Sequence, residues 1–396
     1  MTSRETITCL GPAGHHLEVL DPNPICLARF SRWVRHVHSC PHAGREPLRY
    51  IERLAEVVRR NEIDVVLPTH EQAWLLANAG QMLPPHVRVA VAKSEAFARV
   101  QSKLAFAELL EKLCLPQPAW RRVRAADDLD GLAFPYWLKS AFSTAGQGVR
   151  EVVDERSRAE SLAALLGDAP LIAQSPAAGR YGQVQGLFDH GRMVAVHTSV
   201  QRGRGIGGSA AARLSVDHPA PREHVAVIGE ALGWHGGLTL DYFHEEGEPS
   251  YIECNPRTVE PGNASSSGVN IPELQLRLTL GEALPSPARV GRPGVRTHGT
   301  IALLLGSAAD GASRKTLLTE LHDAMTGRGL YAQSAEQLTP VVRDPPSFLA
   351  AAFVTGRTLM SARNAARLAE QAVSGYSIGP TAVAAVARAA GRPPVA

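Results

Sequence analysis

Length, composition and charge set the first bounds on this protein. The chain has 396 residues, of which 44% are hydrophobic, 20% charged and 5% aromatic, an ordinary globular composition in a chain too long for one compact core. Its 41 Lys and Arg exceed its 38 Asp and Glu by only three, which is too weak and scattered a charge to indicate a nucleic-acid groove or a membrane patch. We therefore expect two or three domains, no nucleic acid and no membrane as partners.

The cysteines and the N-terminus bear on location. The N-terminus lacks a basic start followed by an apolar core, and no apolar run approaches the roughly 20 residues of a spanning helix. Five cysteines are an odd number without CxxC spacing, which fits a reducing compartment better than a disulfide framework. We expect a soluble, cytoplasmic protein, and we expect it to form a homodimer.

Strand and helix patterns alternate in the first part of the chain and predict a small open α/β sheet. An amphipathic helix is expected over 47–62, and strands are expected at 16–21, 63–69 and 87–92. Too few residues precede the first of these strands for a complete βα unit. The sheet is therefore either one strand short or begins with a bare helix.

The middle of the chain has an α+β pattern, typical of one large domain that contains a smaller lobe. Ser102 caps a helix that Pro116 and Pro118 stop. Strands are expected at 134–140, 150–154, 170–176 and 182–201, with helices at 156–168 and 224–234, before a hairpin at 237–257. Beyond residue 297, one more strand is expected at 299–308, followed by Ala-rich helices at 314–329, 345–360, 362–373 and 380–391.

The hairpin "GLTLDYFHEEGEPSYIECNPR" carries unusual charges for two half-buried strands. If its loop is 245–249, the register sets Phe243 opposite Tyr251 and Asp241 opposite Glu253. Like charges that face each other across a sheet are destabilising, and such a carboxylate pair raises one pKa unless a cation lies between. Alternation along the second strand places Ile252 and Cys254 on the inner face and Glu253 with Asn255 on the other.

Two carboxylates and an Asn carbonyl are hard oxygen ligands that suit Mg²⁺, which completes its shell with water and phosphate oxygens. We therefore expect a metal site at Asp241, Glu253 and Asn255. Pro256 ends the strand, so that Arg257 emerges at the rim, where its guanidinium can hold a carboxylate or a phosphoryl group. The competing interpretation is a solvated hairpin face with incidental acids.

A second signal lies upstream, where Lys139 ends a strand and the Gly-rich turn "SAFSTAGQGV" follows it. Backbone N–H groups of such a turn can approach phosphates closely. Lys103 lies in the first turn of the preceding helix. A lysine before a Gly-rich turn is weak evidence by itself and gains weight only together with the hairpin.

The order of these features resembles that of the ATP-grasp superfamily over roughly residues 10 to 300, and "YIECNPR" closely resembles its Glu-x-Asn-Pro-Arg signature. The resemblance implies a mixed α/β and α+β fold. Its parts are a pre-ATP-grasp domain at 1–98, an ATP-grasp domain at 99–297 with a small lid lobe at about 132–178, and the last strand with a helical extension at 298–396. It also implies Mg²⁺ on the three hairpin ligands, ATP phosphates on Lys103 and Lys139, and nucleotide contacts from Ser143, Thr144, Gly146, Gly148, Gln174, Ala177 and Tyr181.

Three features depart from the superfamily pattern. Many relatives carry a Glu that holds the ribose hydroxyls, and Tyr181 stands at that position. The acid of the hinge is replaced by Gln174, and the N-terminus is shortened. These changes bear on nucleotide affinity and base choice, whereas the metal ligands and both lysines are retained.

Relatives with this site typically phosphorylate a carboxylate with ATP and then let an amine displace the phosphate. By this resemblance Lys139 and Arg257 are catalytic, because they neutralise phosphates and steady the acyl phosphate. Arg202 and Arg204 lie in the Gly-rich segment 201–212, either a mobile flap over the substrate or a plain solvent loop. Further candidates for substrate binding are Arg257 itself, Glu260 and, after the predicted strand 63–69, Glu71.

The leading hypothesis is an ATP- and Mg²⁺-dependent carboxylate–amine ligase of the amino-acid or dipeptide type, with small molecules as its carboxylate and amine partners. Two alternatives remain: a biotin carboxylase or carbamoyl-phosphate relative that uses bicarbonate, and a degenerate nucleotide-binding module. A separate run, "RHVHSCPH", has metal-ligand types at tight spacing. It is also typical of an exposed strand edge.

Overall fold

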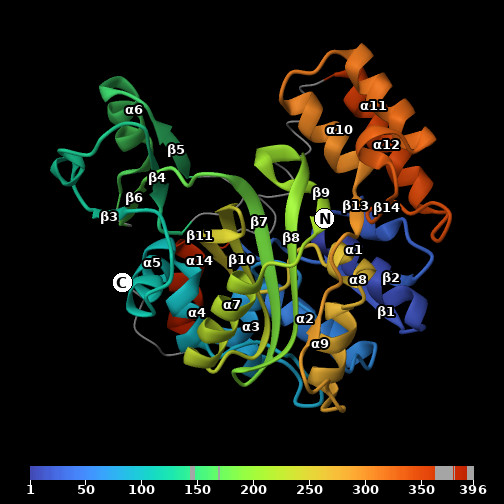
Figure 1. The fold of residues 1–396 in the computed structure, drawn as a ribbon. Helices are drawn as coiled ribbons and strands as arrows, with labels where there is room; N and C mark the ends of the chain where they lie inside the picture. The colour runs from blue at the N-terminus through green and yellow to red at the C-terminus, as the bar shows by residue number, and fades with distance from the viewer. Residues whose placement is uncertain (143–147, 168–169, 362–377, 379, 390–396) are drawn as a thin grey trace.

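The computed structural model describes residues 1–142, 148–167, 170–361, 378 and 380–389 (Figure 1). Among these residues no helix is both long and apolar enough to span a lipid bilayer. The predicted helix at 362–373 lies outside the described residues. Figure 1 shows a small lobe and a group of C-terminal helices that stand on opposite sides of a large central sheet.

The N-terminal region begins with a helix, α1 (Thr2–Leu10), which is one of the two predicted alternatives. Two parallel strands follow, β1 (Leu17–Asp21) and β2 (Val34–Ser39). The predicted strands at 63–69 and 87–92 are wrong as strands, since only an isolated bridge joins Val65 to Arg88. Prolines 68, 84 and 85 flank this bridge, and proline cannot donate to a ladder.

Three helices cover this region. The predicted helix at 47–62 is α2 (Pro47–Arg60), which starts with a proline and buries Ile51, Leu54, Ala55 and Val58 at the spacing of one helical face. The others are α3 (Gln72–Ala79) and α4 (Ser94–Gln101). The C-terminal helix α14 (Pro380–Ala389) packs against α2 and α3, so the two ends of the chain share one core.

The small lobe is an antiparallel sheet with one helix and its own core (Figure 1). Its strand order is β3-β6-β4-β5, and β3 lies before the expected lower bound of about 132. The elements are β3 (Trp120–Val123), β4 (Tyr136–Ser140), β5 (Val149–Val152), α6 (Glu155–Leu165) and β6 (Leu171–Gln174). The linker from β6 leads directly into the central sheet.

The central sheet is mostly antiparallel and runs in the order β11-β10-β7-β8-β9-β13-β14, with β12 beside β8. Leu187 packs toward helix α9 on one face, whereas its neighbour Phe188 packs in the core that contains α7 on the other. The strands are β7 (Arg180–Asp189), β8 (Arg192–Arg204), β9 (Ala210–Ser215), β10 (Gly236–Glu245), β11 (Glu248–Asn255), β12 (Arg289–Val290), β13 (Arg296–His298) and β14 (Ser334–Glu336). The helices around it are α5 (Lys103–Lys112), α7 (Pro219–Ala231), α8 (Gly262–Ser266) and α9 (Ile271–Leu280).

The predicted last strand at 299–308 is wrong, because this segment is the helix α10 (Thr300–Ala309). A short apolar run without alternation fits a buried strand or a buried helix equally well, and Leu and Ala favour the helix. Helices α11 (Arg314–Thr326) and α12 (Ser347–Met360) complete the C-terminal group. The helical character predicted for the rest of this region is confirmed where residues are described.

Gly236 at the start of β10 fixes the contact between the central sheet and the N-terminal region. Its φ is +99°, and a Cβ there would lie 2.6 Å from the carbonyl oxygen of Ala90. We expect Gly236→Ala to lower the free energy of unfolding by about 2 kcal/mol or more, through strain plus a backbone clash. Gly281→Ala is the control, since its φ is +77° with no atom within 4 Å, and about 1 kcal/mol is expected. Equal losses in urea unfolding would contradict the clash.

Candidate functional site

The β10–β11 hairpin brings two carboxylates face to face. Asp241 pairs with Glu253, as predicted, but the predicted pair of Phe243 with Tyr251 is wrong, since Phe243 faces Ser250. The turn is the two residues Glu246–Gly247, which have φ values of +52° and +95°. Such primed two-residue turns match the twist of a hairpin, so the loop is shorter than expected.

A β-bulge next to the acid pair reconciles the short turn with the predicted facing of the carboxylates. The register shifts by one residue between Asp241 and Tyr242, which leaves Ile252 as the extra residue of β11. Tyr251 is therefore fully buried in the core, and Cys254 follows it at 7% exposure. Ile252, which was expected to face inward beside Cys254, is half-buried and lines a small pocket together with Lys103.

Asp241 is buried among neutral donors. Its Oδ1 accepts from Gln183 Nε2 at 2.8 Å, and its Oδ2 accepts from Asn255 Nδ2 at 3.1 Å. Burial, and then the charge of Glu253, raises the pKa of Asp241 to about 6. Burial is thus the larger cause of the raised pKa, and the facing carboxylate adds to it.

Two lysines border the acid pair from different elements. Lys103 begins α5, directly after its cap Ser102, and its Nζ lies 3.0 Å from Glu253 Oε1. Lys139, near the end of β4, donates from Nζ to Gln174 Oε1 at 2.6 Å. The backbone N–H of Lys103 donates to the carbonyl of Ala141 at 2.9 Å, which ties α5 to the turn after β4.

Lys139 is the lysine whose charge the fold opposes. Burial lowers its pKa to about 8; Glu253 raises it and Lys103 lowers it further. The unfolded chain binds the proton more tightly between about pH 8 and 10.5, so stability rises with pH over that range. From pH 8 to 10 we expect the unfolding free energy of wild type to rise relative to that of Lys139→Met by on the order of 2 kcal/mol. A flat gap, equal to that of the exposed Lys112→Met control, would refute the pKa assignment.

A larger pocket, with an empty volume of about 490 Å³, opens beside Glu253 and Asn255. Arg257 lines it, and the Nη1 of this arginine is buried without a hydrogen-bond partner among the described residues. Across the pocket lie His70, whose pKa burial lowers well below its usual value, and Glu71, whose Oε2 accepts from the backbone of Ile378 at 2.6 Å. The pocket is thus lined both by β11, which carries the Glu-x-Asn-Pro-Arg signature, and by the N-terminal region.

The donor set fits Mg²⁺. Two carboxylates face each other, and the amide nitrogen of Asn255 is used on Asp241, which leaves its carbonyl oxygen for another partner. Lys103 balances Glu253, whereas among the described residues no charged group is bonded to Asp241. A hard divalent cation with oxygen ligands satisfies this arrangement.

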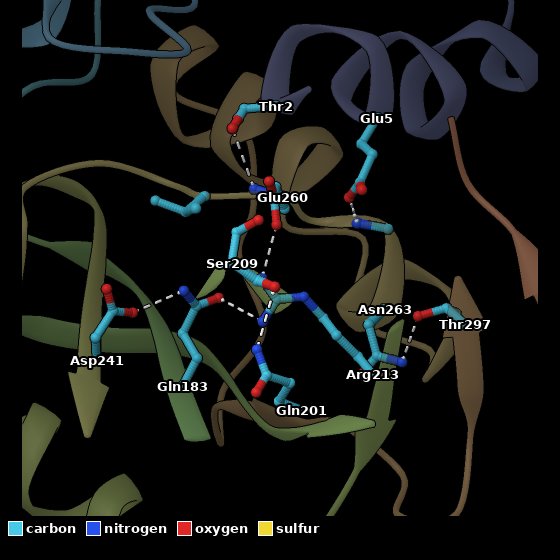
Figure 2. A network of polar contacts seen from close by, with 12 residues as sticks. Thr2, Glu5, Gln183, Gln201, Ser209, Arg213, Asp241, Glu260, Asn263 and Thr297 are labelled. Atoms are coloured by element: carbon cyan, nitrogen blue, oxygen red, sulfur yellow. Dashed lines mark hydrogen bonds and ion pairs between the residues drawn. The ribbon is translucent and has the colours of Figure 1, made fainter. Parts of the chain in front are cut away.

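A buried arginine that the sequence reading missed reaches the acid pair through a glutamine (Figure 2). Arg213 on β9 is 6% exposed; its Nη1 donates to Gln183 Oε1 at 3.1 Å, and its Nη2 lies 2.7 Å from Glu260 Oε2. Gln183 in turn donates to Asp241. The signal was present in "AAARLSV", where one arginine interrupts an apolar strand.

Helix α1 closes this network from the N-terminal side (Figure 2). Glu5 accepts from the backbone N–H of Gly262 at 2.7 Å, and burial followed by the charge of Glu260 raises the pKa of Glu5 to about 7. Thr2 accepts from the backbone N–H of Glu260 at 3.4 Å. Helix α1 is therefore hydrogen-bonded to the segment 260–262, which follows β11.

Several expected contacts lie elsewhere. The segment 201–212 consists of the end of β8, a short connection at 205–209 and the start of β9. Arg202 donates from Nη1 to the carbonyl of Leu330 at 3.3 Å, and Arg204 is exposed. Glu260 is engaged by Arg213. Ser143, Thr144 and Gly146 lie outside the described residues.

The remaining nucleotide candidates flank the lysines. Gly148 has φ +74° and accepts from Ser140 N at 2.8 Å, and Gln174 holds Lys139. Tyr181 sits beside Phe243 with ring centroids 5.9 Å apart, and the half-buried Ala177 lies in the linker between β6 and β7. Among described residues no group of three metal ligands forms within "RHVHSCPH".

Known proteins share this architecture. No family model matches the chain. It is 25% identical over 267 residues to the carbamoyl phosphate synthase large chain of Rubrobacter xylanophilus, covering 60% of this chain and 25% of that protein. The chain thus spans about a quarter of the length of this curated relative.

Solved structures extend the likeness over most of the chain. N5-carboxyaminoimidazole synthetase from Staphylococcus aureus, complexed with ADP, matches with a TM-score of 0.58 and 14% identity over 82% of this chain and 84% of that one. The L-amino acid ligase from Bacillus licheniformis matches with a TM-score of 0.52 and 16% identity over 70% and 72%. The resemblance inferred from "YIECNPR" is thereby confirmed at the level of fold: the chain has the ATP-grasp fold.

Proposed function

We propose that this protein is an ATP- and Mg²⁺-dependent ligase that activates a carboxylate as an acyl phosphate and joins it to an amine. The observation that carries the proposal is the facing pair of Asp241 and Glu253, with two buried lysines beside it. One lysine comes from the small lobe and the other from α5, so nucleotide phosphates can be held between the lobes. The ADP complex of the S. aureus synthetase supports a nucleotide at the equivalent fold position.

In this proposal Mg²⁺ is held by Asp241, Glu253 and Asn255 and offsets the negative charge of the phosphates. Lys103 and Lys139 bind phosphate oxygens, while Gln174, Ala177, Tyr181 and Gly148 contact the nucleotide. A carboxylate oxygen of the substrate attacks the γ-phosphorus and ADP leaves. The amine nitrogen then attacks the carbonyl carbon, the C–O bond to phosphate breaks, and the nitrogen loses a proton.

Arg257 is the proposed group for the substrate carboxylate and the acyl phosphate. Its unpaired Nη1 points to an anion that is missing from its surroundings, because a buried guanidinium N–H without an acceptor is costly. Glu71, on the far wall of the same pocket, is a proposed substrate contact. Arg202 and Arg204 remain weaker proposals, since the first already bonds Leu330 and the second is exposed.

A bicarbonate-using activity is the second candidate, favoured by the match to carbamoyl phosphate synthase. A homodimer, a cytoplasmic location and the domain limits 1–98, 99–297 and 298–396 are also proposals.

The test is release of ADP and phosphate from ATP and Mg²⁺ in the presence of an amino-acid panel or of bicarbonate, with products identified by mass spectrometry. Release that depends on an amino acid supports the ligase, and release that depends on bicarbonate supports the second candidate. ATP binding without turnover under either condition would overturn both and leave a nucleotide-binding module.

A further inference from the structure

A second group of metal-ligating side chains lies away from the proposed active site. Asp189 ends β7, His190 occupies the turn into β8, and His235 directly precedes β10. In the described part of the chain this is the only group of three or more such side chains whose ligand atoms all lie within 4.8 Å of one another. Asp241 lies six positions along the extended chain from His235, on the order of 20 Å, so the proposed reaction does not use this group.

The backbone fixes the three residues relative to one another. Gly236 pairs with Phe188 in the ladder between β10 and β7. Gly191, in the turn, donates its N–H to the carbonyl of Trp234 at 2.7 Å, and the Trp234 side chain is only 1% exposed. The turn at the end of β7 is therefore held against the start of β10 before any ligand binds.

His235 and Asp189 face each other without forming a hydrogen bond. The Nδ1 of His235 is buried, has no hydrogen-bond partner, and lies 3.7 Å from Asp189 Oδ1. The other oxygen of Asp189 accepts from Arg192 at 3.0 Å, which leaves Oδ1 for another partner. A separation of 3.7 Å is too long for a hydrogen bond, but it is close to the roughly 3.3 Å between two ligands of a tetrahedral zinc ion.

His190 is the third ligand candidate and has an unusual backbone. Its φ is +48°, in the left-handed region where a turn of this kind ordinarily carries Gly or Asn. Its ring stacks on that of His235 with centroids 4.2 Å apart and planes inclined by 15°. His190 is also exposed, so one side of the cluster is open to solvent.

We propose that Asp189, His190 and His235 bind one divalent transition-metal ion, zinc by preference, with an open position toward solvent. Two imidazole nitrogens and one carboxylate suit zinc, nickel or copper, whereas Mg²⁺ prefers an all-oxygen shell. The ion joins the β7–β8 turn to the start of β10. Strand β7 carries Gln183, and strand β10 carries Asp241. The site does not depend on the proposed ligase reaction.

The test uses the full chain without an affinity tag, stripped of metal and free of nucleotide. Titration with Zn²⁺ in a calorimeter is expected to show one site per chain and a raised melting temperature, and Mg²⁺ is expected to show neither effect at this site. His235→Ala and His190→Ala are expected to weaken zinc binding at least about 10-fold. Asp189→Asn keeps the shape of the turn and is expected to weaken zinc binding to a similar degree.

The matched control is the double variant His36→Ala, His38→Ala, which alters the other histidine-rich segment and should leave zinc binding unchanged. Absence of zinc binding in wild type would overturn the proposal. So would zinc binding that survives in His235→Ala or disappears in the control variant. Circular dichroism of each variant verifies that the fold is retained.

Discussion

Glu253→Gln is expected to abolish substrate-dependent ADP formation, with a loss of at least about 100-fold, while the protein remains folded. The variant keeps the shape of the side chain but removes one of the two carboxylates that face each other across the hairpin. Magnesium supplies several kcal/mol of charge stabilisation in phosphoryl transfer, and about 2.7 kcal/mol corresponds to 100-fold. Activity is measured by coupled ADP detection at saturating substrate, together with binding of Mg²⁺ and ATP.

Glu248→Gln is the matched control, since it makes the same change on the same strand at an exposed position. It should keep wild-type activity. Glu253→Gln also removes the ion pair with Lys103, so Lys103→Met is compared with it. If the metal assignment is right, raising Mg²⁺ partly restores Glu253→Gln and does not restore Lys103→Met. Undiminished activity in Glu253→Gln would remove Glu253 from the metal site.

The sequence predicted the facing of Asp241 and Glu253 better than it predicted the details of the hairpin that carries them. An assumed loop at 245–249 set Asp241 opposite Glu253, and this pairing is right because two register shifts that the sequence did not reveal offset each other. The turn and the bulge at Ile252 were not readable. Each shifts the register by one residue, and the two shifts cancel from Asp241 opposite Glu253 to Thr239 opposite Asn255.

Longer-range features were beyond a sequence reading for another reason. Arg213 meets Glu260 across 47 residues, and Glu5 meets Gly262 across 257. No local pattern encodes such pairs, because they depend on how whole elements pack. The helix α10 was misassigned for a local reason, since an apolar run of its length has no period that separates strand from helix.

Arg213→Met is expected to lower the free energy of unfolding by about 3 to 5 kcal/mol, the largest effect on stability that we anticipate. Arg213 bonds both Glu260 and Gln183, and its loss leaves the mostly buried carboxylate of Glu260 without its ion-pair partner. Urea unfolding measures the loss. Arg204→Met, at an exposed position in the neighbouring strand, is the control and should stay within about 0.5 kcal/mol of wild type.

The double variant Arg213→Met, Glu260→Gln separates the ion pair from simple packing. If the unpaired charge causes the loss, the double variant is more stable than Arg213→Met alone, because no buried carboxylate is left uncompensated. The Oε1 of Gln183 also loses one of its two donors and keeps only Gln185 Nε2, so the Mg²⁺ concentration needed for half-maximal activity should rise about 10-fold or more. An Arg213→Met protein with wild-type stability and wild-type Mg²⁺ dependence would show that Arg213 neither supports the fold nor positions the metal ligands through Gln183.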